Sequence, residues 1–358
     1  MARLQSSDAL LVRLPNWLGD FVMVEPVVDA LAQATQAGRI RRLALAAPER
    51  FYDLFGSRFE GVARLSPGAS WRGFDVALFL DGSLGSVLRA VRCSVRERWG
   101  WSSGGRGLAL TAGFAPAKER GGVPLSLGVK GRGQRHLPRY FASAANELVG
   151  SFGIPVMDRA PALKSTSGAR RSVAARLQGF GLEPGQGYLV LDASARPDSA
   201  KAANHELWAA ALRRADLDSL PPIVLLSAPG EASVARALAK ELDYPRVHLF
   251  DDLPPTLGEL LAVIEGCELF LGPDSGPRHL ATACDRPQVI LCGPTDPRHT
   301  GGDNRKTELL RIETGCGPCH LERCPLPDDL YGHCMGDIDP QQIAAALHGA
   351  LGAVPSVS

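Results

Sequence analysis

Short runs of apolar residues alternate along the chain with longer stretches in which apolar positions recur every three or four residues. In the first half, the continuous apolar runs predict buried strands at residues 9–14, 43–47, 76–80 and 98–101. Helical spacing lies between or after these runs, at residues 22–36, 83–92 and 137–152. Residues 102–135 are rich in glycine and basic residues and have weak periodicity, which predicts loops.

The second half repeats this alternation after a loop-like boundary at residues 155–167. Strands are predicted at residues 188–191, 223–226, 247–250, 269–271 and 289–292. Helices are predicted at residues 169–177, 206–214, 231–241, 257–265 and 277–284. Short continuous apolar strands that alternate with helices are typical of parallel sheets covered on both faces. We therefore expect an α/β protein with two Rossmann-like parallel-sheet domains, residues 1–160 and 161–358, facing across a cleft.

Length and composition agree with two ordered domains. A chain of 358 residues exceeds the size of a single typical core, and 45% of the residues are apolar. A net charge of +1 gives no reason to expect a nucleic-acid partner. Apolar runs are too short for a membrane span, and Arg13 and Pro15 interrupt the first one too early for a secretory signal. The predicted location is therefore the cytoplasm. No G-x-G-x-x-G follows the first strand, so no dinucleotide cofactor is expected.

The eight cysteines fall into two groups. Four lie in apolar or helical surroundings and are expected to fill core: Cys93, Cys267, Cys284 and Cys292. The other four share one segment with the spacing C-x2-C-x4-C-x9-C: Cys316, Cys319, Cys324 and Cys334. In the cytosol such a group favours metal or redox use over structural disulfides. Only one C-x2-C pair is present, so zinc binding and simple packing of a short loop both stay open.

The most informative stretch is the turn of small residues at 272–277, which joins a predicted strand to a predicted helix. Backbone N–H groups at such a helix start, together with the helix dipole, suit a phosphate. Asp274 would repel an anion and fits better as an acceptor for a sugar hydroxyl, so a phosphorylated sugar is the first hypothesis. The alternative is an ordinary helix capped by Asp274 or Ser275. His279 could donate to a phosphate or hold the turn together.

Other candidates stand at strand ends, where ligands collect in open α/β sheets. Asp20, with Trp17 nearby to exclude water, could be a general base or could cap a helix. Lys201 could neutralise a diphosphate or be merely solvated. Glu231 could accept from ribose hydroxyls or stand at a helix start for dipole reasons. The turn at residues 293–295 offers amides and a hydroxyl, or is only a turn.

Three blocks of sequence together resemble glycosyltransferase family 9, the ADP-heptose:lipopolysaccharide heptosyltransferases. They are residues 13–20 with Pro26, residues 274–283 continuing to 293–295, and the cysteine segment from Cys316 to Met335. The Asn-Trp-Leu-Gly-Asp form of the first block and the cysteine tail look most like the heptosyltransferase II branch. The resemblance implies a GT-B fold with the acceptor on the N-terminal side and the nucleotide-sugar on the C-terminal side. It also implies an inverting, metal-independent transfer.

The resemblance also implies roles for single residues. Asp20 matches the family's proposed base, Lys201 the lysine at the donor phosphates, Glu231 the acid near the ribose, and Asp274 the carboxylate at the heptose hydroxyls. The full donor set is Lys201, Glu231, Asp274, Ser275, Gly276, His279, Gly293 and Thr295, with the amides of Ser275 and Gly276 at the diphosphate. The acceptor set is Asn16, Trp17, Gly19, Ser83 and Arg106. No residue is assigned to a metal.

Two departures from the family pattern leave the substrates open. Lys201 is followed by Ala-Ala-Asn where the family often has Arg-Trp-Pro, and residues 81–86 lack a basic residue common after the first serine. The basic residues of the glycine-rich region could instead contact phosphates of a lipid-linked acceptor, or form a solvated loop. They are Arg106, Lys130, Arg132 and Arg135.

The sequence thus predicts a cytoplasmic enzyme that moves heptose from ADP-heptose to the inner core of lipopolysaccharide. Its expected partners are an ADP-sugar donor and a lipid-linked oligosaccharide acceptor, and a transient contact with the inner-membrane surface stays open. Alternatives are a family relative that uses another nucleotide-sugar, a catalytically silent nucleotide-sugar-binding protein, and a zinc-stabilised scaffold. The C-terminal helix is a candidate for packing back on the first domain.

Overall fold

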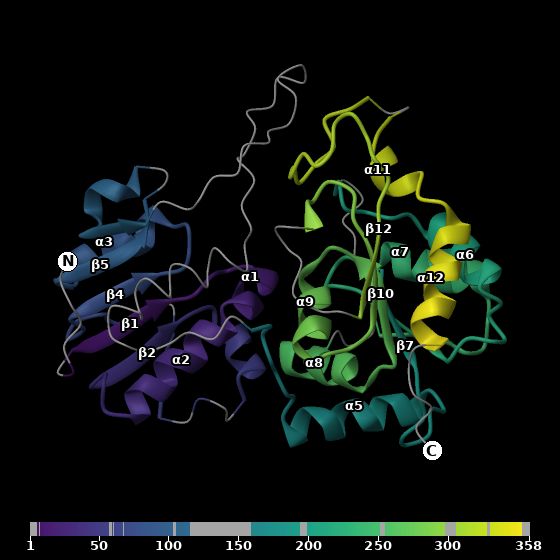
Figure 1. Cartoon of the computed structure of the whole chain (residues 1–358). Helices are drawn as coiled ribbons and strands as arrows, with labels where there is room; N and C mark the ends of the chain where they lie inside the picture. Colours follow the sequence, from purple (N-terminus) through teal and green to yellow (C-terminus); the bar gives the residue numbers. More distant parts are fainter. Residues whose placement is uncertain are drawn as a thin grey trace. The chain divides into compact units, whose positions relative to one another are not determined.

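The computed structural model divides into two compact units (Figure 1). Its described residues up to Phe114, together with residues 159–162, form the first unit, and those from Leu163 onward form the second. The described residues are 6, 8–56, 59, 61–66, 68–102, 105–114, 159–193, 199–250, 255–297, 306–327 and 330–352. The predicted helix at 137–152 and the basic residues Lys130, Arg132 and Arg135 lie outside them.

The first unit is a six-stranded sheet with the order β3-β2-β1-β4-β5-β6, in which every pair of neighbours is parallel. Its strands are β1 (Ala9–Arg13), β2 (Arg42–Ala46), β3 (Ala63–Leu65), β4 (Val76–Phe79), β5 (Glu97–Trp101) and β6 (Ala112–Phe114). Its helices are α1 (Leu18–Met23), α2 (Glu25–Gln36), α3 (Leu84–Arg92) and the 3₁₀ turns η1 (Glu49–Leu54) and η2 (Arg106–Ala109). This order is that of Rossmann folds.

Alternate residues of each central strand face opposite sides of the first sheet. Ala9 and Leu11 of β1 share a buried cluster with Val87 and Ala90 of α3, so α3 covers that face. Leu10 and Val12 point to the other face, and α2 packs against β2. Burial on both faces explains why the central strands are continuous apolar runs.

The second unit repeats the topology in a second parallel sheet with the order β12-β11-β10-β7-β8-β9. Its strands are β7 (Leu189–Asp192), β8 (Ile223–Leu226), β9 (Val247–Leu249), β10 (Leu269–Pro273), β11 (Gln288–Leu291) and β12 (Thr307–Leu310). Its helices are α5 (Ser167–Gly179), α6 (His205–Arg214), α7 (Ser233–Leu242), α8 (Leu257–Gly266), α9 (Gly276–Ala283), α11 (His333–Gly336) and α12 (Pro340–Gly352). Counted within the unit, the order is again that of a Rossmann fold.

Helices cover both faces of this sheet as well. One face packs its strand residues against α6, α7 and α12, and Trp208 of α6 is fully buried there. The other face carries α8 and α9, with α5 packed on α8 (Figure 1). The α12 helix packs on α6 and beside β11 and β12, so these contacts lie within the second unit. The packing of the C-terminal helix back on the first domain stays a prediction.

All nine strands predicted from the sequence are present, which confirms the α/β class and the two parallel sheets. Three short strands were not predicted: β3, β6 and β12. Each lies at the edge of a sheet, and β3 and β12 contain no fully buried residue, so no continuous apolar run marks them.

Three predicted segments need correction. The helix expected at 22–36 is two helices, α1 and α2, which join at Val24, and Pro26 lies in the first turn of α2. The loops expected at 102–135 include η2 and β6. Helix α7 starts at Ser233, so Glu231 lies in the preceding turn rather than in the helix. Among the helices of the described residues, none is long and apolar enough to cross a membrane.

Candidate functional site

Adjacent strands β7 and β10 mark the point in the second sheet where the strand order reverses. In open α/β sheets, ligands bind outside the carboxyl ends of the strands at this point. β7 ends on Asp192, and β10 leads into Asp274 and Ser275. Both carboxylates are buried, Asp192 fully and Asp274 to 98% of its surface. A buried carboxylate needs partners of opposite charge or hydrogen-bond donors, so the surroundings of this pair define the site.

Two cations accompany Asp274. Lys201 Nζ donates to the Asp274 backbone carbonyl over 2.8 Å, although the two residues are 73 positions apart. The Arg278 guanidinium donates to Asp274 Oδ1 over 3.3 Å, and both side chains are only 2% exposed. The structure thus brings together Lys201 and Asp274, which the sequence analysis placed at the same donor. Arg278 adds a buried charge that the sequence analysis did not select.

Electrostatics around Asp274 set the charge state of the site. Burial by itself would raise the pKa of Asp274, but the charges of Arg278 and Lys201 outweigh it and hold the pKa below its ordinary value. The pKa of His279 is also lowered, by burial and by the nearby charge of Arg278, and for a base this favours the neutral form. The site therefore contains an ionised carboxylate and a neutral imidazole, and His279 can offer an anion a hydrogen bond but no positive charge.

Ser275 has a role that a capping motif would not give it. It is the N-cap residue of α9, yet its side chain makes no capping hydrogen bond. Its hydroxyl donates instead to Asp192 Oδ2 over 2.7 Å. The alternative of an ordinary capped helix is therefore wrong for this serine. This hydrogen bond joins the carboxyl end of β7 to the start of α9. The backbone amides of Gly276 and the following residues begin the helix there.

The cysteine segment contacts two loops that carry donor candidates. His320 N donates to Pro294 O over 2.8 Å, and Ala200 N donates to Glu322 O over 2.9 Å. The turn containing Pro294 also meets α11 closely: a Cβ on Gly293 would lie 2.6 Å from Met335 Sδ and 2.9 Å from Cys334 Sγ. The segment thus joins the loop of Lys201 to the predicted turn at residues 293–295.

The remaining donor candidates lie at the same edge of the second sheet. Thr295 is buried, and its hydroxyl helps to lower the pKa of Asp274. Glu231 is half-buried in the turn after β8, where its N–H donates to Ala228 O over 2.9 Å. Asn204, where the family often has proline, caps α6 by accepting from Leu207 N over 2.9 Å. That departure from the family pattern therefore has a structural use of its own.

The matching reversal in the first sheet lies between β1 and β4, and Arg13 links their ends. Its guanidinium donates to Asn16 Oδ1 over 2.5 Å and to the carbonyls of Leu14 and Ala46. It also lies 3.4 Å from Asp81 Oδ2, which accepts from the Ser86 hydroxyl over 2.7 Å. Burial raises the pKa of Asp81, although the Ser86 hydroxyl and the charge of Arg13 oppose this.

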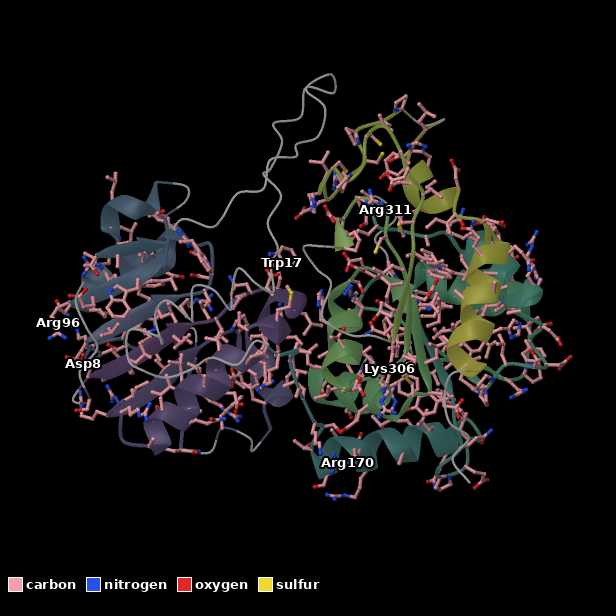
Figure 2. All side chains as sticks on the ribbon, viewed as in Figure 1. Asp8, Trp17, Arg96, Arg170, Lys306 and Arg311 are labelled. Carbon is pink, nitrogen blue, oxygen red and sulfur yellow. The ribbon has the colours of Figure 1, made fainter. Side chains whose placement is uncertain are left out.

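Asp20 lies in the first turn of α1, directly beyond the carboxyl end of β1. The N-cap of this helix is Trp17, so Asp20 is not the N-cap residue that the alternative required. Asp20 and Gly19 are half-buried, whereas Trp17 is 70% exposed at the start of α1 (Figure 2). A carboxylate held in a first helical turn at a strand end is well placed to meet a ligand, but the exposed Trp17 does not enclose it.

The other two acceptor candidates make structural contacts. Ser83 caps α3 by accepting from Ser86 N over 3.3 Å. Arg106 is buried and donates to the carbonyls of Trp101 and Asp81. This burial excludes a solvated loop residue at this position and favours a role for Arg106 in holding the edge of the sheet.

The cysteines are all free thiols. Cys316 Sγ lies 3.6 Å from His333 Nε2. The pKa of Cys334 is raised mainly by burial and, to a smaller extent, by the other three cysteines of the segment. Within the described parts of the chain, no three His, Cys, Asp or Glu side chains are arranged to hold a metal ion.

Sequence comparison decides the family. The sequence model of glycosyltransferase family 9 (heptosyltransferase) matches residues 70–328, more than half of the chain. The chain belongs to glycosyltransferase family 9. The family expected from the three sequence blocks is therefore confirmed.

Individual relatives match over shorter stretches. Lipooligosaccharide heptosyltransferase 2 of Campylobacter jejuni is 33% identical over 89 residues, 25% of this chain and 27% of the relative. Lipopolysaccharide heptosyltransferase 2 of Salmonella typhimurium is 34% identical over 95 residues, 26% of each chain. Lipopolysaccharide heptosyltransferase 1 of the same organism is 41% identical over 76 residues, 21% of this chain and 22% of the relative. The matched stretches span about a quarter of each relative, and both heptosyltransferase types occur among them.

Solved structures show the same fold over the whole chain. Escherichia coli ADP-heptose lipopolysaccharide heptosyltransferase II matches with a TM-score of 0.71 and 20% identity, over 96% of this chain and 98% of that one. The family 9 glycosyltransferase of Veillonella parvula matches with a TM-score of 0.73 and 14% identity, over 98% and 99%. At these identities the likeness concerns the fold, and it confirms the GT-B architecture.

The sequence analysis did not select three residues that the structure places at these sheet edges: Asp192, Arg278 and Asp81. Asp192 and Asp81 carried a usable signal, because each is a carboxylate at the carboxyl end of an apolar strand, where ligands gather. Arg278 carried a weaker one, its spacing of four residues from Asp274 on a predicted helix.

Proposed function

We propose that this family 9 protein transfers heptose from ADP-heptose to the inner core of lipopolysaccharide, with inversion at the anomeric carbon and without a metal ion. The observation that carries the proposal is the contact between Lys201 and Asp274 at the strand-order reversal of the second sheet. The two residues are far apart in sequence, and the family resemblance assigns both to the donor.

The chemistry follows from the residues at each edge. Asp20 takes the proton of the acceptor hydroxyl as that oxygen attacks the anomeric carbon. The bond from that carbon to the diphosphate breaks, and ADP leaves with an added negative charge. Lys201 and the amides at the start of α9 offset this charge, so the transfer does not require magnesium. Asp274, ionised and fixed by Arg278, accepts hydrogen bonds from sugar hydroxyls.

Two variants test the proposal together. Lys201→Ala should weaken ADP binding by about ten- to a hundredfold, because it removes one charge-assisted hydrogen bond. Asp20→Ala should lower kcat by about a hundred- to ten-thousandfold and leave ADP binding nearly unchanged. Calorimetric titration with ADP, UDP and GDP measures the first effect, and turnover of ADP-heptose on a lipopolysaccharide core acceptor measures the second.

Matched controls are the exposed Lys240→Ala and Asp53→Ala, which should change neither quantity. A preference for UDP or GDP over ADP would be compatible with the family but would contradict ADP-heptose as the donor. Wild-type turnover in Asp20→Ala would contradict its role as the base. Absence of binding to any nucleotide would contradict the proposal as a whole.

A further inference from the structure

Four of the five large apolar side chains that the first unit exposes among its described residues lie on two neighbouring elements. The five are Trp17, Leu84, Leu88, Val91 and Leu108. Three of them lie on α3, and Leu108, 97% exposed, lies on η2, which packs against α3. Single exposed leucines are common on protein surfaces. A group of exposed apolar side chains on one helix and the adjoining turn instead indicates a surface that binds a partner. We call α3 and η2 together the α3 surface.

The α3 helix has a wider apolar arc than the sheet covers. At 3.6 residues per turn, its apolar residues Ala90, Val87, Val91, Leu84 and Leu88 follow one another over roughly 160° of the helix. Ala90 and Val87 form one half of this arc and are completely buried. The other half has no such cover, since Leu84 is 44% exposed, Leu88 39% and Val91 44%. The second half of the arc therefore has no function in the core.

Positive charges predominate in the sequence around this arc. Between Gly82 and Phe114 the sequence contains five arginines, Arg89, Arg92, Arg96, Arg98 and Arg106, and one acidic residue, Glu97. The net charge of this segment is therefore +4, although the whole chain carries only +1. Arg106 is buried and Arg96 pairs with Asp8 over 3.1 Å, so these two arginines do not border the arc with uncompensated charge. Arg92 is exposed and follows the uncovered apolar stripe on the helix, and α3 contains no acidic residue. An apolar stripe bordered by cations suits an anionic lipid surface better than an acidic or basic protein face.

The position of the α3 surface relative to the acceptor candidates agrees with this partner. Helix α3 begins and η2 lies just beyond the carboxyl ends of β4 and β5. Arg13, at the carboxyl end of β1, lies 3.4 Å from the Ser86 hydroxyl in the first turn of α3. The exposed Trp17 follows at the same sheet edge, and tryptophan favours the boundary between lipid and water. The surface thus starts at the edge that carries Asp20.

We propose that the α3 surface docks the protein on a bilayer that contains anionic lipid, with Leu84, Leu88, Val91 and Leu108 at the acyl boundary and Arg92 at the headgroups. The inference rests on the proposed function in one respect, because a lipid-linked acceptor is what gives such docking its use. Docking keeps the acceptor edge of the first sheet close to acceptors that cannot leave the membrane.

The test is co-sedimentation with vesicles. The wild type should bind vesicles of phosphatidylethanolamine and phosphatidylglycerol and bind pure phosphatidylcholine weakly. The triple variant Leu84→Ser, Leu88→Ser, Val91→Ser should lower the partition coefficient at least about tenfold, since it removes most of the uncovered apolar area. Arg92→Glu should weaken binding about tenfold on the anionic vesicles only. The double variant Leu309→Ser, Leu330→Ser removes exposed leucines of the second unit and should bind as the wild type does.

The outcomes separate this surface from the proposed function. Circular dichroism and thermal unfolding of the triple variant should match the wild type, because the replaced side chains are exposed. Binding of the triple variant equal to the wild type, or no binding of the wild type, overturns the inference. Self-association of the wild type that the triple variant abolishes, without vesicle binding, also overturns it and makes the surface a protein interface. Heptose transfer to a soluble acceptor fragment tests the proposed function independently of vesicles.

Discussion

At the scale of single residues, Asp274 shows how a buried charge is kept in a site. Its carboxylate is almost inaccessible, which would favour the neutral acid if it stood alone. Arg278 on the following helix, α9, and Lys201 from a distant loop reverse that preference. The site thus contains an ionised hydrogen-bond acceptor at neutral pH beside two cationic donors, as the proposed binding of a sugar diphosphate requires.

His279 provides a residue-scale prediction about pH. Burial and Arg278 lower its pKa in the folded state, whereas the unfolded chain takes up a proton near pH 6.5. Between those values the unfolded state binds more protons, so the free energy of unfolding falls as the pH falls below about 6.5. The loss approaches about 1.4 kcal/mol per pH unit for this one group.

Urea unfolding at pH 7.5, 6 and 5 measures the effect as the difference between the wild type and His279→Gln. The variant should show a flatter pH dependence over this range, whatever its stability at pH 7.5. The exposed His348→Gln should keep the slope of the wild type. Equal slopes in the wild type and His279→Gln would show that the imidazole is protonated when folded.

At the scale of elements, the cysteine segment acts as a brace: it holds two loops at the edge of the second sheet that carries the donor candidates. It contacts the chain just before Lys201 through Glu322 and the turn after β11 through His320. Its helix α11 leaves no space for a side chain at Gly293. Packing of this segment thus sets the positions of two loops that the sequence places about a hundred residues apart.

Replacement of Gly293 tests the brace. Gly293→Ala places a Cβ 2.6 Å from Sδ of the fully buried Met335, so that side chain must shift within the core, and we expect a loss of about 1–3 kcal/mol in the free energy of unfolding. Gly315→Ala is the matched control, because a Cβ there meets nothing within 4 Å. Denaturant unfolding of both variants measures the difference. A Gly293→Ala protein as stable as the Gly315→Ala protein would show that α11 does not press on the turn.

At the scale of the whole molecule, one topology occurs twice. Each unit has a parallel sheet whose order reverses between two neighbouring strands, and each reversal carries a buried aspartate with polar partners. In the first unit these groups stand beside the acceptor candidates, and in the second they stand beside the donor candidates. The duplication gives the fold two equivalent sheet edges, one for each substrate of the proposed reaction.

The charges at these edges predict the response of the whole enzyme to metal removal. In the proposed mechanism Lys201 and the amides of α9 offset the charge on the leaving diphosphate, so EDTA should change the turnover rate by less than about twofold. The measurement is heptose transfer before and after dialysis against EDTA, with metal analysis of the purified protein. Loss of turnover restored by a divalent cation would contradict the metal-free mechanism, and loss restored only by zinc would favour a structural site in the cysteine segment.

The sequence by itself determined the class of fold, most elements and the family. Strands buried on both faces must be continuously apolar, so β1, β4, β7, β8 and β10 were visible as runs. Edge strands such as β3 and β12 face solvent and carry no such pattern, which is why they were missed. The sequence also offered Asp20, Lys201 and Asp274 as site candidates, from their places after predicted strands and from the family resemblance, and these assignments stay predictions.

Only the tertiary structure decided which of these residues meet and which apolar positions stay uncovered. The contact between Lys201 and Asp274 depends on the pairing of β7 with β10, a long-range event that local spacing does not encode. In the same way, the periodicity of α3 predicts a helix but not that half of its apolar arc lies outside the core. Periodicity reports where side chains point along one element, whereas burial depends on what the rest of the chain places against them.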